Sequence, residues 1–131
     1  MIGEYISIGK IVPVDITCQL LKKAMEKNGW AAKKFLIDGF PRNQDNFDGW
    51  ERVIGDSVEV PFIVFMEADE DTMIARIMDR SKTSDRDDDN IEVLKNRFAI
   101  FKGETMPIVN FYEKLGKCRR INGLQAIDVV F

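Results

Sequence analysis

An acid, an arginine and two amides follow one another closely in FLIDGFPRNQDN, residues 35–46. Asp38 ends a short apolar run, a place from which a carboxylate can hold a magnesium ion through water, although an ordinary turn aspartate is an equal alternative. Arg42 follows a Gly-Phe-Pro turn, so its guanidinium can bind a phosphate with two hydrogen bonds; the alternative is a solvated surface arginine. Asn43 and Asn46 can face one ligand from the first turn of a helix, or they can cap that helix.

A second arginine-bearing stretch, DRSKTSDRDDDN at residues 79–90, holds Arg80 and Arg86 among many acids. Such a charge run is usually a solvated loop. Arg97 follows in the next predicted helix, however, and could converge with Arg86 and Arg42 on one multiply charged ligand. Arginines gathered around a site suit phosphoryl transfer, because that reaction depends on positioning and charge stabilisation more than on a general base.

What the sequence lacks narrows the chemistry further. It contains no histidine, which excludes Ser-His-Asp and Cys-His nucleophile systems and any His-ligated metal. Its two cysteines, Cys18 and Cys118, form no CxxC motif and are expected to be buried, reduced thiols. The motif GxxxxGK[ST], whose backbone amides cradle donor phosphates, is also absent, because GEYISIGKI has the wrong glycine spacing and an isoleucine after its lysine.

Short apolar strands that alternate with amphipathic helices must position these residues. We expect strands at residues 34–38, 61–69 and 117–122, the first two buried on both faces, and helices at residues 13–28, 43–53, 69–80 and 90–115, with the start of another at 126–131. The last long helix should bend or break at Gly103 and Pro107. The first should bury one face, formed by Ile16, Leu20, Leu21 and Ala24. This order predicts a parallel α/β sheet with helices on both faces, whose ligands bind at the carboxyl ends of the strands.

The composition fits one globular domain. The chain has 131 residues, 45% of them hydrophobic and 31% charged, enough for a single hydrophobic core. A formal charge of −3 gives no reason to expect a nucleic-acid partner. No apolar run approaches the roughly 20 residues of a membrane span, and the start of the chain does not read as a secretory signal.

Four blocks together resemble the nucleoside monophosphate kinases, and most closely the UMP-CMP kinase branch of the adenylate kinase family. They are GKIVPVDIT, FLIDGFPRNQDN, DRSKTSDRDDDN and NRFAIFKGETMPIVNFYEKLG, in the order of the family and across nearly the whole chain. The resemblance implies an α/β fold with a P-loop NTPase-like parallel sheet, flanking helices and a short lid at about residues 80–90, N-terminally truncated. It implies one incomplete kinase domain over residues 1–131 and phosphoryl transfer from ATP to UMP or CMP, with Mg²⁺, in pyrimidine nucleotide biosynthesis.

The resemblance also assigns acceptor-side roles position by position. Arg42 would bind the acceptor phosphate, while Asn43 and Asn46 would face the base. Adenylate kinases usually carry glutamine where this chain has Asn46, and the shorter amide suits a smaller base. The implied acceptor-side residues are Lys10, Ile11, Val12, Gly39, Phe40, Pro41, Arg42, Asn43 and Asn46.

On the donor side, the resemblance places the Arg80 side chain and the Gln125 backbone near the ATP adenine. Arg86 and Arg97 would stabilise the transferring phosphoryl group, and Asp88 would help close the lid over it. No residue would ligate the metal directly, since Asp38 would act through water.

Two features depart from the family pattern. Ser81 and Asp85 stand where the family usually has lid glycines, so we expect a stiffer lid and slower turnover. The family's first strand, P-loop and first helix precede the segment equivalent to residue 1, so we expect a fragment or mis-started product that does not catalyse transfer alone. The complete form is implied to be a cytoplasmic monomer, with the nucleus as an alternative location and no nucleic-acid or membrane partner.

Two alternatives stay open at this point. One is an inactive fragment that acts as a weak nucleotide-binding module, which ATP turnover by the isolated chain would distinguish from the kinase. The other is an adenylate kinase with AMP as acceptor, for which a clear AMP preference would count against the interpretation of Asn46.

Overall fold

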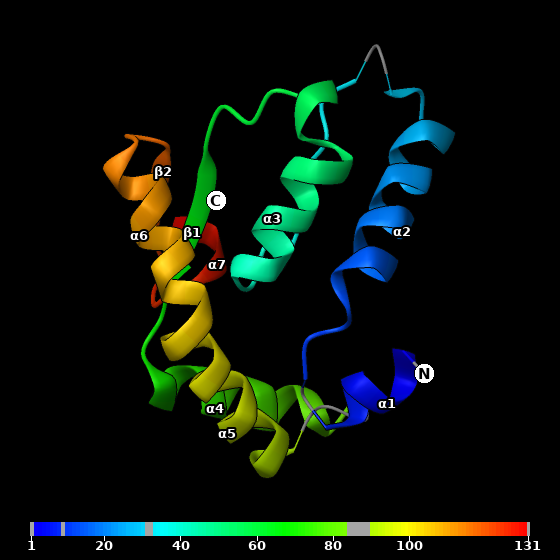
Figure 1. The fold of residues 1–131 in the computed structure, drawn as a ribbon. Helices are drawn as coiled ribbons and strands as arrows, with labels where there is room; N and C mark the ends of the chain where they lie inside the picture. Colours follow the sequence, from blue (N-terminus) through cyan, green and yellow to red (C-terminus); the bar gives the residue numbers. More distant parts are fainter. Residues whose placement is uncertain (1, 9, 31–32, 84–89, 131) are drawn as a thin grey trace.

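The computed structural model describes residues 2–8, 10–30, 33–83 and 90–130. In this part of the chain two strands pair in parallel and helices flank them (Figure 1). The elements are α1 Ile2–Ser7, α2 Val14–Lys27, α3 Gln44–Val53, a short 3₁₀ turn Gly55–Ser57, β1 Ile63–Glu67, α4 Glu70–Ser81, α5 Ile91–Ile100, a π-helical turn Phe101–Thr105, α6 Met106–Lys114, β2 Cys118–Asn122 and α7 Ile127–Val130. The predicted α/β class is confirmed, whereas α1 was not expected from the sequence. None of the helices in these ranges combines the length and apolar character needed to cross a bilayer.

Three helices begin at polar side chains that cap their free backbone N–H groups. The Oδ1 atoms of Asn43, Asp69 and Asn90 accept hydrogen bonds from backbone N–H groups three residues on, at 2.8, 2.7 and 3.0 Å. Because such caps satisfy donors that the helix itself leaves unpaired, they fix where α3, α4 and α5 begin. The helix predicted at residues 90–115 is found at residues 91–114, and the irregularity predicted near Gly103 takes the form of the π turn between α5 and α6, with no gap in the helical conformation.

The two strands pair in parallel from Ile63 opposite Cys118 to Glu67 opposite Asn122. One face of this pair is covered, since Phe65 stacks on Phe101 of the π turn at 5.9 Å between ring centroids. On the other face, Phe62, Val64 and Met66 are each more than 40% exposed. The expectation that β1 is buried on both faces is therefore wrong, because within the described residues helices cover only one side of it.

Residues 34–38 form no strand in the structure, and the prediction of one is a second error. The segment is extended, but the described sheet contains only β1 and β2, so it has no neighbouring strand to pair with. Leu36 is 92% exposed, whereas Ile37 packs against the cluster formed by Met25, Trp50 and Ile54. The segment is thus held by the packing of Ile37 and not by a hydrogen-bonded ladder.

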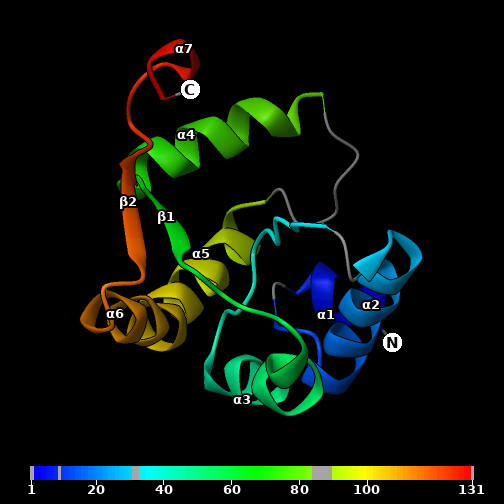
Figure 2. The same cartoon turned by 90° about the horizontal axis from the view of Figure 1, so that it is seen from above.

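Helices α2 and α3 pack closely, and both views place α3 between α2 and α6 (Figure 1, Figure 2). Gly49 of α3 makes this approach possible, because a Cβ atom there would collide with the Val14 side chain of α2.

The buried stripe of α2 consists of Val14, Cys18 and Met25, while Leu20 is 55% exposed. Of the predicted inward residues, Ala24 is exposed as well, and Ile16 and Leu21 are half-buried. The face of α2 that packs against α3 is therefore rotated about the helix axis from the predicted face.

Both cysteines were predicted to be buried, reduced thiols, and this is confirmed for Cys18. Both are free; Cys18 is fully buried, and burial raises the pKa of its thiol, which keeps it protonated and unreactive. Cys118 is only half-buried at the start of β2.

Strand β2 is tied to its neighbours by Arg120, and this cluster makes stability depend on pH. Arg120 binds Glu113 of α6 through two hydrogen bonds of 2.7 and 3.0 Å and also pairs with Glu67 of β1. The hydrogen bond from Arg120 lowers the pKa of Glu113 below its usual value of 4.5.

A carboxyl group whose pKa is lower when folded contributes stability above its unfolded pKa, and that stability is lost as the pH falls through the folded value. We therefore expect the free energy of unfolding to decrease below about pH 4.5, less steeply in Glu113→Gln than in the wild type. Urea titrations between pH 7 and pH 3 measure this. Glu26→Gln is the control, because Glu26 is exposed on α2 and its carboxylate has no ion pair within the described residues. Equal pH profiles for the two variants would count against a role of Glu113.

Candidate functional site

The turn from Gly39 to Arg42 folds its arginine back over its own backbone. Gly39 has φ +69°, a left-handed conformation that favours glycine, and the following Phe40–Pro41 peptide bond is cis. The Nε atom of Arg42 donates a hydrogen bond of 2.6 Å to the Gly39 carbonyl oxygen. A Cβ atom at Gly39 would lie 2.8 Å from Nη2 of Arg42, so the glycine leaves the space that the guanidinium occupies. The side chain of Arg42 remains exposed.

Both polar backbone groups of Arg42 are held by distant or buried side chains. Its N–H donates to Oδ1 of Asn46 at 3.2 Å, and its carbonyl oxygen accepts from Oγ1 of Thr105 at 2.6 Å. Asn46 is only 2% exposed, and its Nδ2 atom has no hydrogen-bond partner among the described residues. A buried amide group without an acceptor costs roughly 1–3 kcal/mol, which a ligand that offered an acceptor to it would recover.

Asn43 links the same turn to the π turn. Besides capping α3, it donates from Nδ2 to Oε2 of Glu104 at 3.2 Å. A hollow of about 380 Å³ opens beside this contact. It is lined by Asn43, Gln44, Asp45, Gly103, Glu104, Pro107 and Ile108. The structure thus brings together the predicted residues Arg42, Asn43 and Asn46.

The other predicted residues lie on separate elements. Lys10 is exposed, and its N–H donates to the Tyr5 carbonyl oxygen at 2.9 Å, between α1 and α2. Ile11 and Val12 follow it and are half-buried.

Of the residues predicted to serve the phosphoryl donor, Arg80 is exposed in the last turn of α4, Arg97 is half-buried in α5, and Gln125 is exposed in the turn after β2. The Gly123 carbonyl of that turn accepts a 2.6 Å hydrogen bond from Arg76 of α4. Arg86 and Asp88, together with Asp85, lie outside the described residues.

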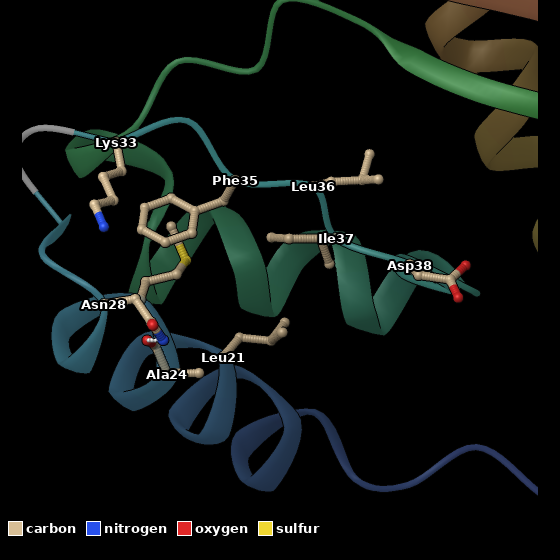
Figure 3. A pocket seen from close by; sticks show the side chains of 9 residues that line it. Leu21, Ala24, Asn28, Lys33, Phe35, Leu36, Ile37 and Asp38 are labelled. Carbon is tan, nitrogen blue, oxygen red and sulfur yellow. Dashed lines mark hydrogen bonds between the residues drawn. The ribbon is translucent and has the colours of Figure 1, made fainter.

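Asp38 is exposed at the end of the extended segment, next to a mostly apolar cavity of about 420 Å³ (Figure 3). The cavity is lined by residues of α2 and of this segment: Leu21, Ala24, Met25, Asn28, Lys33, Phe35, Leu36, Ile37 and Asp38. Its apolar lining does not suit phosphates. The described residues contain no group of three acids, cysteines or histidines that could cage a metal ion. A single exposed carboxylate instead fits Mg²⁺ held mainly by water and phosphate oxygens.

Two residues that hold the site, Glu104 and Thr105, were not predicted from the sequence. Both belong to the π turn, and the predicted break at Gly103 and Pro107 was the signal that this segment is irregular. The break gave the position of the irregularity but could not show which side chains would reach residues 42 and 43.

Comparison with known proteins defines the class of this fold and site. The family model described as adenylate kinase matches residues 1–117. Over its whole length, the chain is 43% identical to UMP-CMP kinase of Gallus gallus, 46% to that of Xenopus laevis and 42% to that of Homo sapiens, covering 68, 69 and 68% of those proteins. The chain therefore belongs to the adenylate kinase family, whose members are nucleotide kinases.

The substitution Gly39→Ala tests whether the turn places the guanidinium. We expect the nucleoside monophosphate affinity to fall about threefold to tenfold, because the new methyl group displaces Nη2 and removes a charge-assisted contact. The positive φ adds about 1–2 kcal/mol of strain to the folded state. Isothermal titration calorimetry with CMP and urea unfolding measure the two effects separately.

Gly29→Ala is the matched control. Gly29 has φ +81°, and a Cβ atom there would meet nothing within 4 Å. Both variants should lose similar stability, but Gly29→Ala should bind CMP as the wild type does. Equal affinity in all three proteins would show that the position of the guanidinium does not matter.

Proposed function

We propose that this chain provides the acceptor side of a UMP-CMP kinase, with ATP as phosphoryl donor. The observation that carries the proposal is the Gly39–Arg42 turn. The exposed guanidinium of Arg42 donates from Nε to the Gly39 carbonyl, and the backbone N–H and carbonyl of Arg42 are bonded to Asn46 and Thr105. A planar guanidinium can bind a phosphate through two parallel N–H donors, and the hydrogen-bonded backbone of this turn limits the entropy lost on binding. The names of the relatives supply the acceptor nucleotides.

In the proposed complex, Arg42 binds the acceptor phosphate and Asn43 and Asn46 face the base. The unpartnered Nδ2 of Asn46 would donate to a ring acceptor of a pyrimidine. An oxygen of the acceptor phosphate would then attack the γ-phosphorus of ATP. The bond between that phosphorus and the oxygen that bridges it to the β-phosphate would break, and ADP would leave. The acceptor phosphate is already ionised, so no histidine is required as a base.

The donor-side assignments are part of the same proposal. Arg86 and Arg97 would stabilise the transferring charge, Arg80 and Gln125 would lie near the adenine, and Asp88 would help close the lid. Lys10, Ile11 and Val12 would line the monophosphate pocket. When bound, Mg²⁺ would neutralise the donor phosphates, with Asp38 holding its water ligands.

Because the 131 residues contain no GxxxxGK[ST] motif, a P-loop outside them would have to cradle the donor phosphates. For these residues alone, the sequence therefore favours nucleotide binding without transfer. A cytoplasmic, monomeric complete form stays a prediction.

The side-chain amide of Asn46 provides the test of base recognition. In ¹H–¹⁵N NMR spectra, CMP and UMP should shift the Nδ2 signals of Asn46 and saturate at lower concentrations than AMP. The side-chain NH₂ group of Asn28 is the internal reference, since it donates locally to the Ala24 carbonyl in α2. Tighter binding of AMP would overturn the pyrimidine assignment while leaving the acceptor site itself intact.

A further inference from the structure

The π turn Phe101–Thr105 reaches across the fold to the arginine-bearing turn. We propose that Thr105 is a positioning residue for Arg42 and that Glu104 supports it through Asn43. The structure shows the contacts of Thr105 with Arg42 and of Glu104 with Asn43, and their consequence for nucleotide binding rests on the proposed function.

The hydroxyl of Thr105 does not behave like that of an ordinary helical threonine. In a helix, a threonine hydroxyl commonly bonds to a carbonyl three or four residues earlier in the same helix. Thr17 in α2 does so, donating to the Pro13 carbonyl at 3.4 Å. Thr105 instead donates at 2.6 Å to Arg42, 63 positions away in the sequence. This bond therefore restrains the tertiary arrangement of the turn.

The π turn explains how two successive side chains face residues 42 and 43. An extra residue in one helical turn rotates the following face by about 100° relative to a continuous α-helix. Pro107, near the start of α6, has no N–H to continue the ladder, and Gly103 leaves open space on its side of the turn. An ion pair between Lys102 and Glu70 ties the π turn to the start of α4.

Two contacts consequently hold adjacent residues of the site. Thr105 holds the carbonyl of Arg42, and Glu104 holds the side chain of Asn43, which also caps α3. Helix α3 is fixed on the same side by Phe47, which packs edge-on against Phe111 of α6 at 5.2 Å. The direction in which the Arg42 side chain leaves the backbone is thus set from the α5–α6 side of the molecule.

The test compares Thr105→Val, which keeps the shape but removes the hydroxyl, with Thr105→Ser, which keeps the hydroxyl. The first readout is the ¹³C shift of the Arg42 carbonyl without any nucleotide. The second is the CMP dissociation constant from calorimetry. Thr105→Val should shift the carbonyl signal and weaken CMP binding about threefold to tenfold, as expected for one lost hydrogen bond, and Thr105→Ser should restore both.

Thr17→Val is the matched control, because the hydroxyl that it removes bonds, among the described residues, to the carbonyl of Pro13 directly before the same helix. It should change neither readout. Glu104→Ala gives a second variant, expected to weaken CMP binding less, since its contact with Asn43 is longer and exposed.

The outcomes separate the two proposals. A carbonyl shift in Thr105→Val with no CMP binding by the wild type would support the contact and overturn the acceptor function. CMP binding that Thr105→Val leaves unchanged would overturn the positioning role and leave the acceptor function standing.

Discussion

Arg42→Ala should weaken CMP binding by roughly 10- to 100-fold, the largest functional effect that we expect from one substitution. Hydrogen bonds to charged groups contribute about 1.5–3 kcal/mol each, and the fixed guanidinium would form such bonds with the acceptor phosphate. Arg42→Lys should bind CMP with an intermediate affinity, because it keeps the charge but loses the planar guanidinium and its paired donors. Calorimetric titration of CMP into each variant at constant ionic strength measures the effect.

Arg52→Ala is the control for net charge. Arg52 lies on α3, the helix that follows the turn, and its exposed guanidinium meets Asp15 at 3.4 Å. An exposed pair of this kind contributes little to stability, so the variant should fold and bind CMP normally. If Arg42→Ala and Arg52→Ala bound CMP equally well, Arg42 would not be the phosphate ligand.

Ile54→Ala should lower the free energy of unfolding by about 2–5 kcal/mol, the largest stability effect that we expect. Ile54 is 1% exposed and packs with Met25 and Trp50 in the cluster that joins α2 to α3. Removing the end of its side chain would leave a cavity in this cluster, against which Phe40 of the arginine-bearing turn also packs, 5.7 Å from Trp50 between ring centroids. Urea unfolding followed by tryptophan fluorescence measures the loss.

Leu36→Ala removes the same kind of apolar side chain from a site that is 92% exposed. It should change the free energy of unfolding by less than about 0.5 kcal/mol. A loss comparable to that of Ile54→Ala would mean that Leu36 is buried in solution, contrary to the structure.

Local sequence signals predicted the helices from α2 to α7 well, but not α1. Asn43, Asp69 and Asn90 cap α3, α4 and α5 through contacts three residues away, and such contacts can be recognised from sequence because they involve only neighbouring positions. The parallel pairing of β1 and β2 also followed from the alternation of strands and helices.

Features that depend on distant partners were predicted less well. The run around Leu36 has the composition of a strand, but a strand requires a paired neighbour, which the described sheet does not offer. The inward face of α2 was misjudged because Gly49, in another helix, decides where α2 can approach α3. Likewise, the sequence placed Arg42 at the site but could not show that Thr105 holds it, since 63 positions separate the two residues.

We propose that the turn ending at Arg42 binds the phosphate of a pyrimidine nucleoside monophosphate. Calorimetric titrations of this chain with CMP, UMP, AMP and cytidine test it most directly. We expect CMP or UMP to bind at least about tenfold more tightly than AMP, and cytidine, which has no phosphate, to show no measurable binding. Equal affinities for CMP and cytidine would contradict a phosphate site at Arg42, and a preference for AMP would contradict the pyrimidine assignment.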